Sequence, residues 1–182
     1  MLTFDPQAHV YRVDGEVVPS VTQILEHAGM ISAFCKDPLA AERGSRVHEA
    51  CALLAQNQLD LATLDERIMG YVLSYAAFLG AASNWTLIRV EQRVFEPLHQ
   101  YAGTYDALFH GWLIDLKSGG PAKWHALQLA AYHHAARLDP RFKRATLYLD
   151  STGKLPRLVE HKDRTDLPTF LKLLEEFRAN GN

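Results

Sequence analysis

Three strand-like segments follow one another without a helix between them, at 86–95, 101–109 and 112–117. The breaks between them hold Pro97 and the pair His110-Gly111, which are typical of turns. Strands joined by connections this short pair with their neighbours in opposite directions. The centre of the chain therefore predicts an antiparallel meander.

Helical periodicity surrounds this meander, since apolar residues recur there at three- and four-residue intervals. A capping box of Ser20 and Gln23 begins the first helix, and Gly29 ends it. We expect helices over 20–29, 38–56, 64–82, 123–137 and 167–178, and further strands over 10–13, 16–18, 145–149 and 158–161. The expected fold class is α/β: a central mixed β-sheet flanked by helices, with an N-terminal hairpin and helices.

The short turn at His110-Gly111 fixes which residues of the second and third strands lie opposite each other. Counting outward from a two-residue loop places Asp106 directly opposite Asp115. Lys117 lies two residues beyond Asp115, so it points to the same sheet face about 7 Å further on. The sequence thus predicts two carboxylates and an amine close together.

The reverse face of these two strands is expected to be apolar and to pack on helices; it comprises Tyr105, Ala107, Phe109, Trp112, Ile114 and Leu116. Directly opposed like charges destabilise a sheet unless a group such as a divalent cation compensates them. Oxygen ligands at this density favour Mg²⁺ or Mn²⁺ over Zn²⁺. The alternative is that Asp106, Asp115 and Lys117 are solvated surface residues. The apolar reverse face favours the metal site.

These segments resemble the PD-(D/E)xK nucleases, specifically their RecB-type branch. The likeness rests on Gly103–Asp106, on Ile114–Gly119 and on Gln128–Tyr132 of the following helix, and it covers about 44–132. The opening at 18–25 is similar to phage-encoded RecB-type exonucleases. The resemblance implies a single nuclease domain over 1–182, with a hairpin and helix at 1–37 and a restriction-endonuclease-like core at 38–182.

The resemblance also implies roles for individual residues. Asp106, Asp115 and the Leu116 backbone carbonyl would hold the metal, and Lys117 would orient the attacking water or stabilise the transition state. Gln128 and Tyr132, on one face of the following helix, would position the lysine, the scissile phosphate or a nearby base.

Two more residues match positions of this branch less specifically. His48, in the segment Gly44–His48, matches a histidine ligand on an early helix, although a buried structural histidine is the alternative. Glu91 matches an acid that some relatives carry on the first strand, unless strand alternation sends it to solvent. Trp124 would join Gln128 and Tyr132 in a stripe beside the site, where core packing explains its ring equally well.

The chain also departs from the family pattern. Tyr105 replaces the proline of the family name, and Asp115 stands where glutamate is commoner, but both carboxylates are kept. With only Cys35 and Cys51, the four cysteines of an iron–sulfur cluster are absent, and we expect both to be reduced and buried. His125, His133 and His134 are expected to be surface or DNA-facing residues, because their spacing does not suit a shared metal.

A net charge of -2 excludes a protein that coats nucleic acid through overall basicity, so any DNA contact must be local. No apolar run reaches the roughly 20 residues of a membrane span, and the start lacks a secretory pattern, so we expect a cytoplasmic protein.

We expect a Mg²⁺- or Mn²⁺-dependent DNA nuclease, an exonuclease of recombination, repair or phage replication. A non-cleaving DNA-end-binding subunit with a nuclease fold and a restriction-type endonuclease are the alternatives. DNA is the expected partner, and a strand-annealing or helicase partner and a homo-oligomer remain open.

Overall fold

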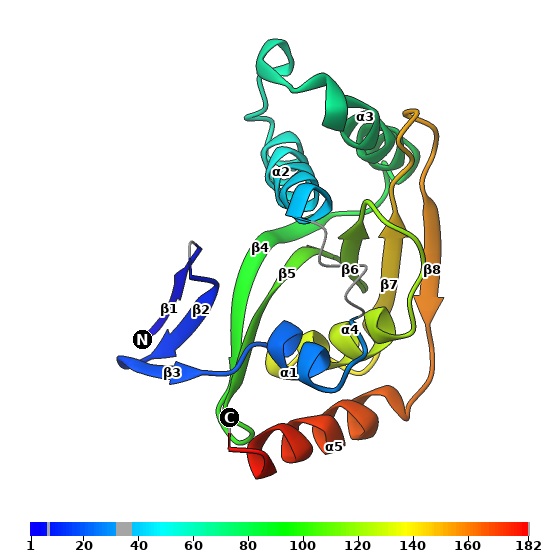
Figure 1. Cartoon of the computed structure of the whole chain (residues 1–182). Coiled ribbons are helices and arrows are strands. Elements are labelled where there is room, and N and C mark those ends of the chain that lie inside the picture. Colours follow the sequence, from blue (N-terminus) through cyan, green and yellow to red (C-terminus); the bar gives the residue numbers. More distant parts are fainter. Residues whose placement is uncertain (7, 32–37, 182) are drawn as a thin grey trace.

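The computed structural model describes residues 1–6, 8–31 and 38–181 (Figure 1). Its N-terminal sheet contains β1 (Leu2–Asp5), β2 (Val10–Val13) and β3 (Glu16–Val18), paired in that order. Asp14 and Gly15 have φ values of 51° and 94°, as the tight hairpin turn between β2 and β3 requires. The expected hairpin is confirmed, but the sequence analysis missed β1, which makes it a three-stranded sheet.

The large sheet has five strands in the order in which they occur along the chain. They are β4 (Leu87–Glu96), β5 (Tyr101–Phe109), β6 (Trp112–Lys117), β7 (Lys143–Tyr148) and β8 (Arg157–His161). Neighbours are antiparallel except β6 and β7, which run parallel because α4 crosses between them. The predicted mixed sheet is confirmed.

Within the described residues, the helices that accompany this sheet are α1 (Val21–His27), α2 (Pro38–Ala55), α3 (Glu66–Ala81), α4 (Trp124–Ala135) and α5 (Asp166–Ala179). The Ser20–Gln23 capping box forms as predicted, with both reciprocal hydrogen bonds present. α3 begins two residues later than expected, because a 3₁₀ turn at Leu61–Thr63 precedes it and Asp65 caps its N-terminus.

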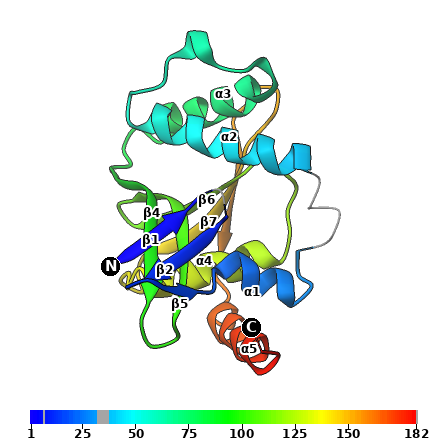
Figure 2. The same cartoon turned by 60° about the vertical axis from the view of Figure 1, so that its left-hand side comes forward.

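The helices form two layers, with α2 and α3 on one side of the sheet and α1, α4 and α5 on the other (Figures 1 and 2). The first layer buries Val47, Cys51 and Val72 against Ile114 and Leu147. A second cluster joins the other three helices to the opposite side of the sheet, with members that include Ile24, Leu113, Leu129 and Phe170. The N-terminal sheet packs beside β4 and β5 through Tyr11, Val18 and Ala102.

The β5–β6 hairpin has the register that its turn predicted, from Phe109↔Trp112 to Ala107↔Ile114. Five residues of the predicted apolar face pack with the α2–α3 layer, but Tyr105 does not. It packs in the α1–α4–α5 cluster, because the regular alternation of β5 breaks at Asp106, where the hydrogen-bonded ladder to β6 ends.

Cys51 is a free, fully buried thiol, as predicted, whereas Cys35 lies outside the described residues. Among the described helices, none is both long and apolar enough to cross a bilayer.

Candidate active site

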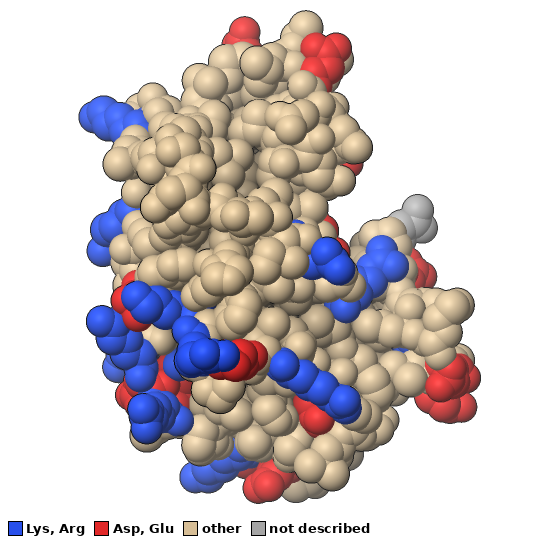
Figure 3. Space-filling model, turned by 180° about the vertical axis from the view of Figure 1, so that it is seen from behind, with Lys and Arg blue, Asp and Glu red and all other residues tan. Residues whose placement is uncertain are grey.

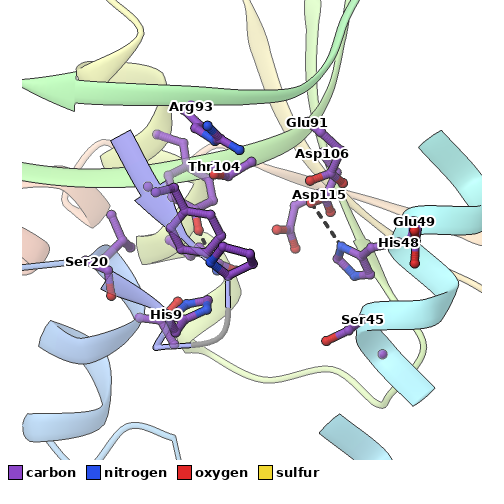
Figure 4. Close-up of a pocket in the computed structure, with 18 of the residues that line it drawn as sticks. His9, Ser20, Ser45, His48, Glu49, Glu91, Arg93, Thr104, Asp106 and Asp115 are labelled. Carbon is purple, nitrogen blue, oxygen red and sulfur yellow. Dashed lines mark hydrogen bonds and ion pairs between the residues drawn. The ribbon is translucent and has the colours of Figure 1, made fainter. Parts of the chain in front are cut away.

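A cavity of about 740 Å³ opens where β4, β5, β6 and α4 meet α2 and the N-terminal sheet (Figure 4). Segments separated by more than a hundred residues form its walls. Its lining includes every side chain to which the sequence assigned a catalytic or metal-binding role: His48, Glu91, Asp106, Asp115, Lys117, Gln128 and Tyr132.

Three carboxylates lie close together on three neighbouring strands. The hydrogen-bonded pairs on either side of Glu91 place it opposite Asp106 between β4 and β5. Asp115 of β6 follows the last β5–β6 pair, Ala107↔Ile114, and lies close enough to Asp106 for the charge of Asp106 to raise its pKa. Like charges in neighbouring positions destabilise a sheet, so this row is costly unless cations or protons compensate it.

Regular strand geometry is interrupted at the level of these carboxylates. Glu91 has a φ of 47°, a left-handed conformation that costs a non-glycine residue about 1–3 kcal/mol. One strand away, Asp106 Oδ2 accepts the backbone N–H of Leu116 at 2.5 Å. Backbone strain of this kind clusters at sites where a side chain is held for chemistry rather than for stability.

His48 lies on α2, and its side chain points towards the three carboxylates (Figure 4). Val47 and Cys51, both fully buried, fix α2 against the sheet, and His48 then lies between them on the cavity side. Its Nδ1 atom is 3.1 Å from Asp106 Oδ1, so the two carboxylate oxygens of Asp106 contact His48 and Leu116 respectively. Asp106 is therefore held from two directions.

The buried Asp115 and the half-buried Lys117 form an ion pair beside Asp106. Lys117 Nζ lies 2.8 Å from Asp115 Oδ2, and 5.1 Å from the centre of the Trp124 ring. The Asp115 Oδ2 atom is buried and accepts no hydrogen bond from the described groups, so its contact with Lys117 is an ion pair. Lys117 is thus the described cation that compensates the charge of the buried Asp115 carboxylate.

The acidic groups and His48 lie so close together that the charge of each one shifts the pKa of its neighbours. Burial, opposed by Lys117 and reinforced by Asp106, raises the pKa of Asp115 to about 6. The Glu91 side chain lines the cavity. Desolvation of its carboxyl group by the surrounding protein, together with the charge of Asp106, raises its pKa to about 7. Burial lowers the pKa of His48, but Asp106 outweighs it and raises that pKa to about 9. Burial also opposes ionisation of Asp106, but His48 and Lys117 outweigh it and lower its pKa.

The donor set fits a divalent metal ion. His48, Glu91 and Asp106 each offer one ligand atom, and these three atoms lie within 4.8 Å of one another. Asp115 adds a buried oxygen on the neighbouring strand. One imidazole among three carboxylates suits a hard, oxygen-preferring cation, and such a cation would supply the positive charge that protons supply in its absence.

Gln128 and Tyr132 form the floor of the cavity from α4. Gln128 Nε2 donates to the Tyr132 hydroxyl at 3.0 Å, while Gln128 Oε1 is buried without a hydrogen-bond donor among the described groups. The Tyr132 ring packs against Gly103, where a Cβ atom would come within 2.4 Å of Cε1. The Leu116 carbonyl has no described contact here, so its role as a ligand stays a prediction.

The structure adds residues that the sequence analysis did not assign to the site. His9, in the turn between β1 and β2, and Tyr11 of β2 line the cavity. Tyr11 is linked to Thr104 by a 2.8 Å hydrogen bond between their hydroxyl groups. Arg93 of β4 also lines it. No local signal identifies the N-terminal residues, because their placement depends on packing between distant segments.

The expectation that His125 is a surface or DNA-facing residue is wrong. Its side chain is buried, and its Nδ1 atom is 2.8 Å from the Tyr148 hydroxyl. Burial, then Lys117, lower the pKa of His125 to about 3, so it stays neutral. His125 lies in the first turn of α4 and faces Tyr148 of β7. The residues around it in the sequence do not indicate which side of the helix faces the sheet.

The comparisons with known proteins bear on the fold alone. No family model matches the chain, and no curated protein matches it. The solved crystal structure of SSO0001 superposes with a TM-score of 0.50 at 18% sequence identity, over 94% of this chain and 79% of that one. At this identity the likeness concerns the arrangement of helices and strands and carries no activity with it.

Proposed function

We propose that this protein is a Mg²⁺-dependent nuclease that hydrolyses phosphodiester bonds of DNA. The observation that carries the proposal is the convergence of Glu91, Asp106 and Asp115 from three strands with Lys117 in one cavity. An acidic cluster beside a half-buried lysine is suited to binding a cation and a phosphate together. The likeness of these segments to RecB-type nucleases supports the same assignment.

Asp106, Asp115, Glu91 and His48 would hold the cation. When bound, Mg²⁺ would polarise a phosphate oxygen and lower the pKa of a water molecule. His48 must give up its proton to serve as a ligand, and its contact with Asp106 then orients the ring.

Lys117 would act on the reacting phosphate. Its ammonium is held by Asp115 on one side and by the Trp124 ring on the other, so it is oriented before substrate arrives. In that position it donates N–H groups to the attacking water or to the negative charge that develops on the phosphate. Gln128 keeps a free carbonyl oxygen beside it, which can accept a hydrogen bond from the same water.

DNA contact would be local to the cavity and its rim. Over the face in Figure 3, Lys and Arg side chains are interspersed with Asp and Glu, in keeping with the net charge of -2. At the cavity, Arg93, Ser45 and Thr104 offer donors for backbone phosphates, and Trp124 offers an aromatic face for a base. We propose exonuclease action in recombination, repair or phage replication, beside a strand-annealing or helicase partner.

The decisive experiment compares wild type with Lys117→Ala on end-labelled linear DNA and on closed circular DNA, with Mg²⁺, Mn²⁺ or chelator. Lys172→Ala is the matched control, because Lys172 is 76% exposed on α5 and outside the cavity. We expect metal-dependent loss of linear DNA that Lys117→Ala reduces by about 10²-fold or more, and that the control leaves unchanged.

The other outcomes separate the alternatives. Binding of DNA ends without cleavage under every metal condition would indicate a non-cleaving DNA-end-binding subunit. Cleavage of closed circular DNA would indicate an endonuclease of restriction type. Cleavage that Lys117→Ala leaves intact would contradict the assigned active site.

A further inference from the structure

A second group of metal-ligating side chains lies at the other end of β4, away from the cavity. Glu96 is the last residue of β4, His99 lies in the turn before β5, and His134 lies in the last turn of α4. Each offers one ligand atom, and the three atoms lie within 4.8 Å of one another. Glu91 and Glu96 are five residues apart along the strand, about 17 Å, so this group is separate from the cavity.

The hydrogen bonds of this group determine which imidazole nitrogens are free. The Tyr101 hydroxyl donates its only proton to the Ala131 carbonyl, so its contact with His134 Nδ1, at 3.0 Å, requires a proton on that nitrogen. His99 Nδ1 is 3.0 Å from Glu96 Oε2, a spacing that suits two ligand atoms of one ion, which would take the place of the proton between them. In the neutral form of the His134 ring, the Nε2 lone pair is therefore unused.

His134 is thus oriented as metal-binding histidines normally are, with one ring nitrogen donating to a fixed acceptor and the other left for the ion. Glu96 is 7% exposed and both histidine rings have intermediate exposure, so few water molecules can reach the ligand atoms and compete for the ion. Two imidazoles and a carboxylate suit a borderline ion such as Zn²⁺, whereas Mg²⁺ prefers oxygen ligands alone.

We infer that Glu96, His99 and His134 form a site for a divalent first-row transition ion, best matched by Zn²⁺, that joins the β4–β5 turn to the end of α4. Its role is structural. The ion would connect a turn to a helix that lies beside it, and α5 is already linked to the same turn through Arg178 and the His99 carbonyl. The inference does not depend on the proposed nuclease activity.

The test measures Zn²⁺ binding by titration calorimetry and the melting temperature with and without Zn²⁺. His48→Ala/Asp106→Asn serves as the parent protein, because it lacks the cavity ligands that would also take Zn²⁺. We expect one Zn²⁺ per chain and a higher melting temperature. Adding His99→Ala or His134→Ala should weaken binding more than about tenfold and remove the shift.

His133→Ala is the matched control, an identical change one residue earlier on α4 in a side chain outside the group. It should keep both the binding and the shift. Where an alanine variant does not melt cooperatively, His99→Gln and His134→Gln replace it with the same expected loss. No stoichiometric binding to the parent, binding that survives both ligand changes, or equal loss in the control would overturn the inference.

Discussion

Replacing Gly103 with alanine should destabilise the protein and disturb the cavity together. A Cβ atom there would lie 2.4 Å from Tyr132 Cε1 and 3.1 Å from Cδ1. Ordinary contacts of a Cβ atom begin near 3.4 Å, so the ring must move by about 1 Å. Tyr132 is 4% exposed and hydrogen-bonded to Gln128, so the shift displaces both side chains on the cavity floor.

Overpacking of this kind costs about 1–3 kcal/mol. For a chain of this length, each kcal/mol lowers the melting temperature by about 2–4 °C, so Gly103→Ala should lower it by roughly 2–12 °C. Cleavage of linear DNA should fall as well, because Gln128 leaves its place beside Lys117. The measurement is a pair of thermal melts with nuclease assays below the melting range.

Gly80→Ala supplies the control for this prediction. Gly80 lies near the end of α3, and a Cβ atom there would meet nothing within 4 Å. Alanine favours helix by about 0.5–1 kcal/mol, so this variant should be neutral or slightly stabilised. A Gly103→Ala protein that melts and cleaves like wild type would refute the packing argument.

Three further outcomes are expected. Gly70→Ala should destabilise more than Gly103→Ala in the same melts, because its Cβ would meet the Ser151 carbonyl oxygen at 1.7 Å and a backbone atom cannot rotate away; equal melting would contradict this. Asp106→Asn should abolish the rise in melting temperature that Mg²⁺ gives wild type, and an undiminished rise would place the metal elsewhere. Burial lowers the pKa of His48 but Asp106 raises it to about 9, above its ordinary 6.5, so the stability from its proton is complete below pH 6.5 and is lost towards pH 9. Metal-free protein should melt at lower temperature as pH rises from 7 to 9, and His48→Gln should flatten that slope; a slope unchanged in His48→Gln would exclude this residue as its source.

Much of the fold followed from local signals. The capping box of Ser20 and the turn at His110-Gly111 act over a few residues, so they could be recognised without knowing the rest of the molecule. That turn also placed Asp106, Asp115 and Lys117 within one cavity, because a two-residue loop sets the register of both strands.

Glu91 and His48 could not be placed in the same way. The β4–β5 connection is longer than a two-residue turn, so the position opposite Asp106 was not countable from the sequence. His48 lies 58 residues before Asp106, and only the packing of α2 on the sheet brings their side chains together.

The sequence by itself determined the helices, the strands other than β1, and the hairpin that unites two acids with a lysine, since each depends on periodicity or on a short turn. Only the tertiary structure decided the walls of the cavity, the approach of His9 and Tyr11, the contact of Gly103 with Tyr132, and the meeting of Glu96 with His134. The physical reason is that these contacts join segments far apart in the chain, and the packing of whole layers sets their distances.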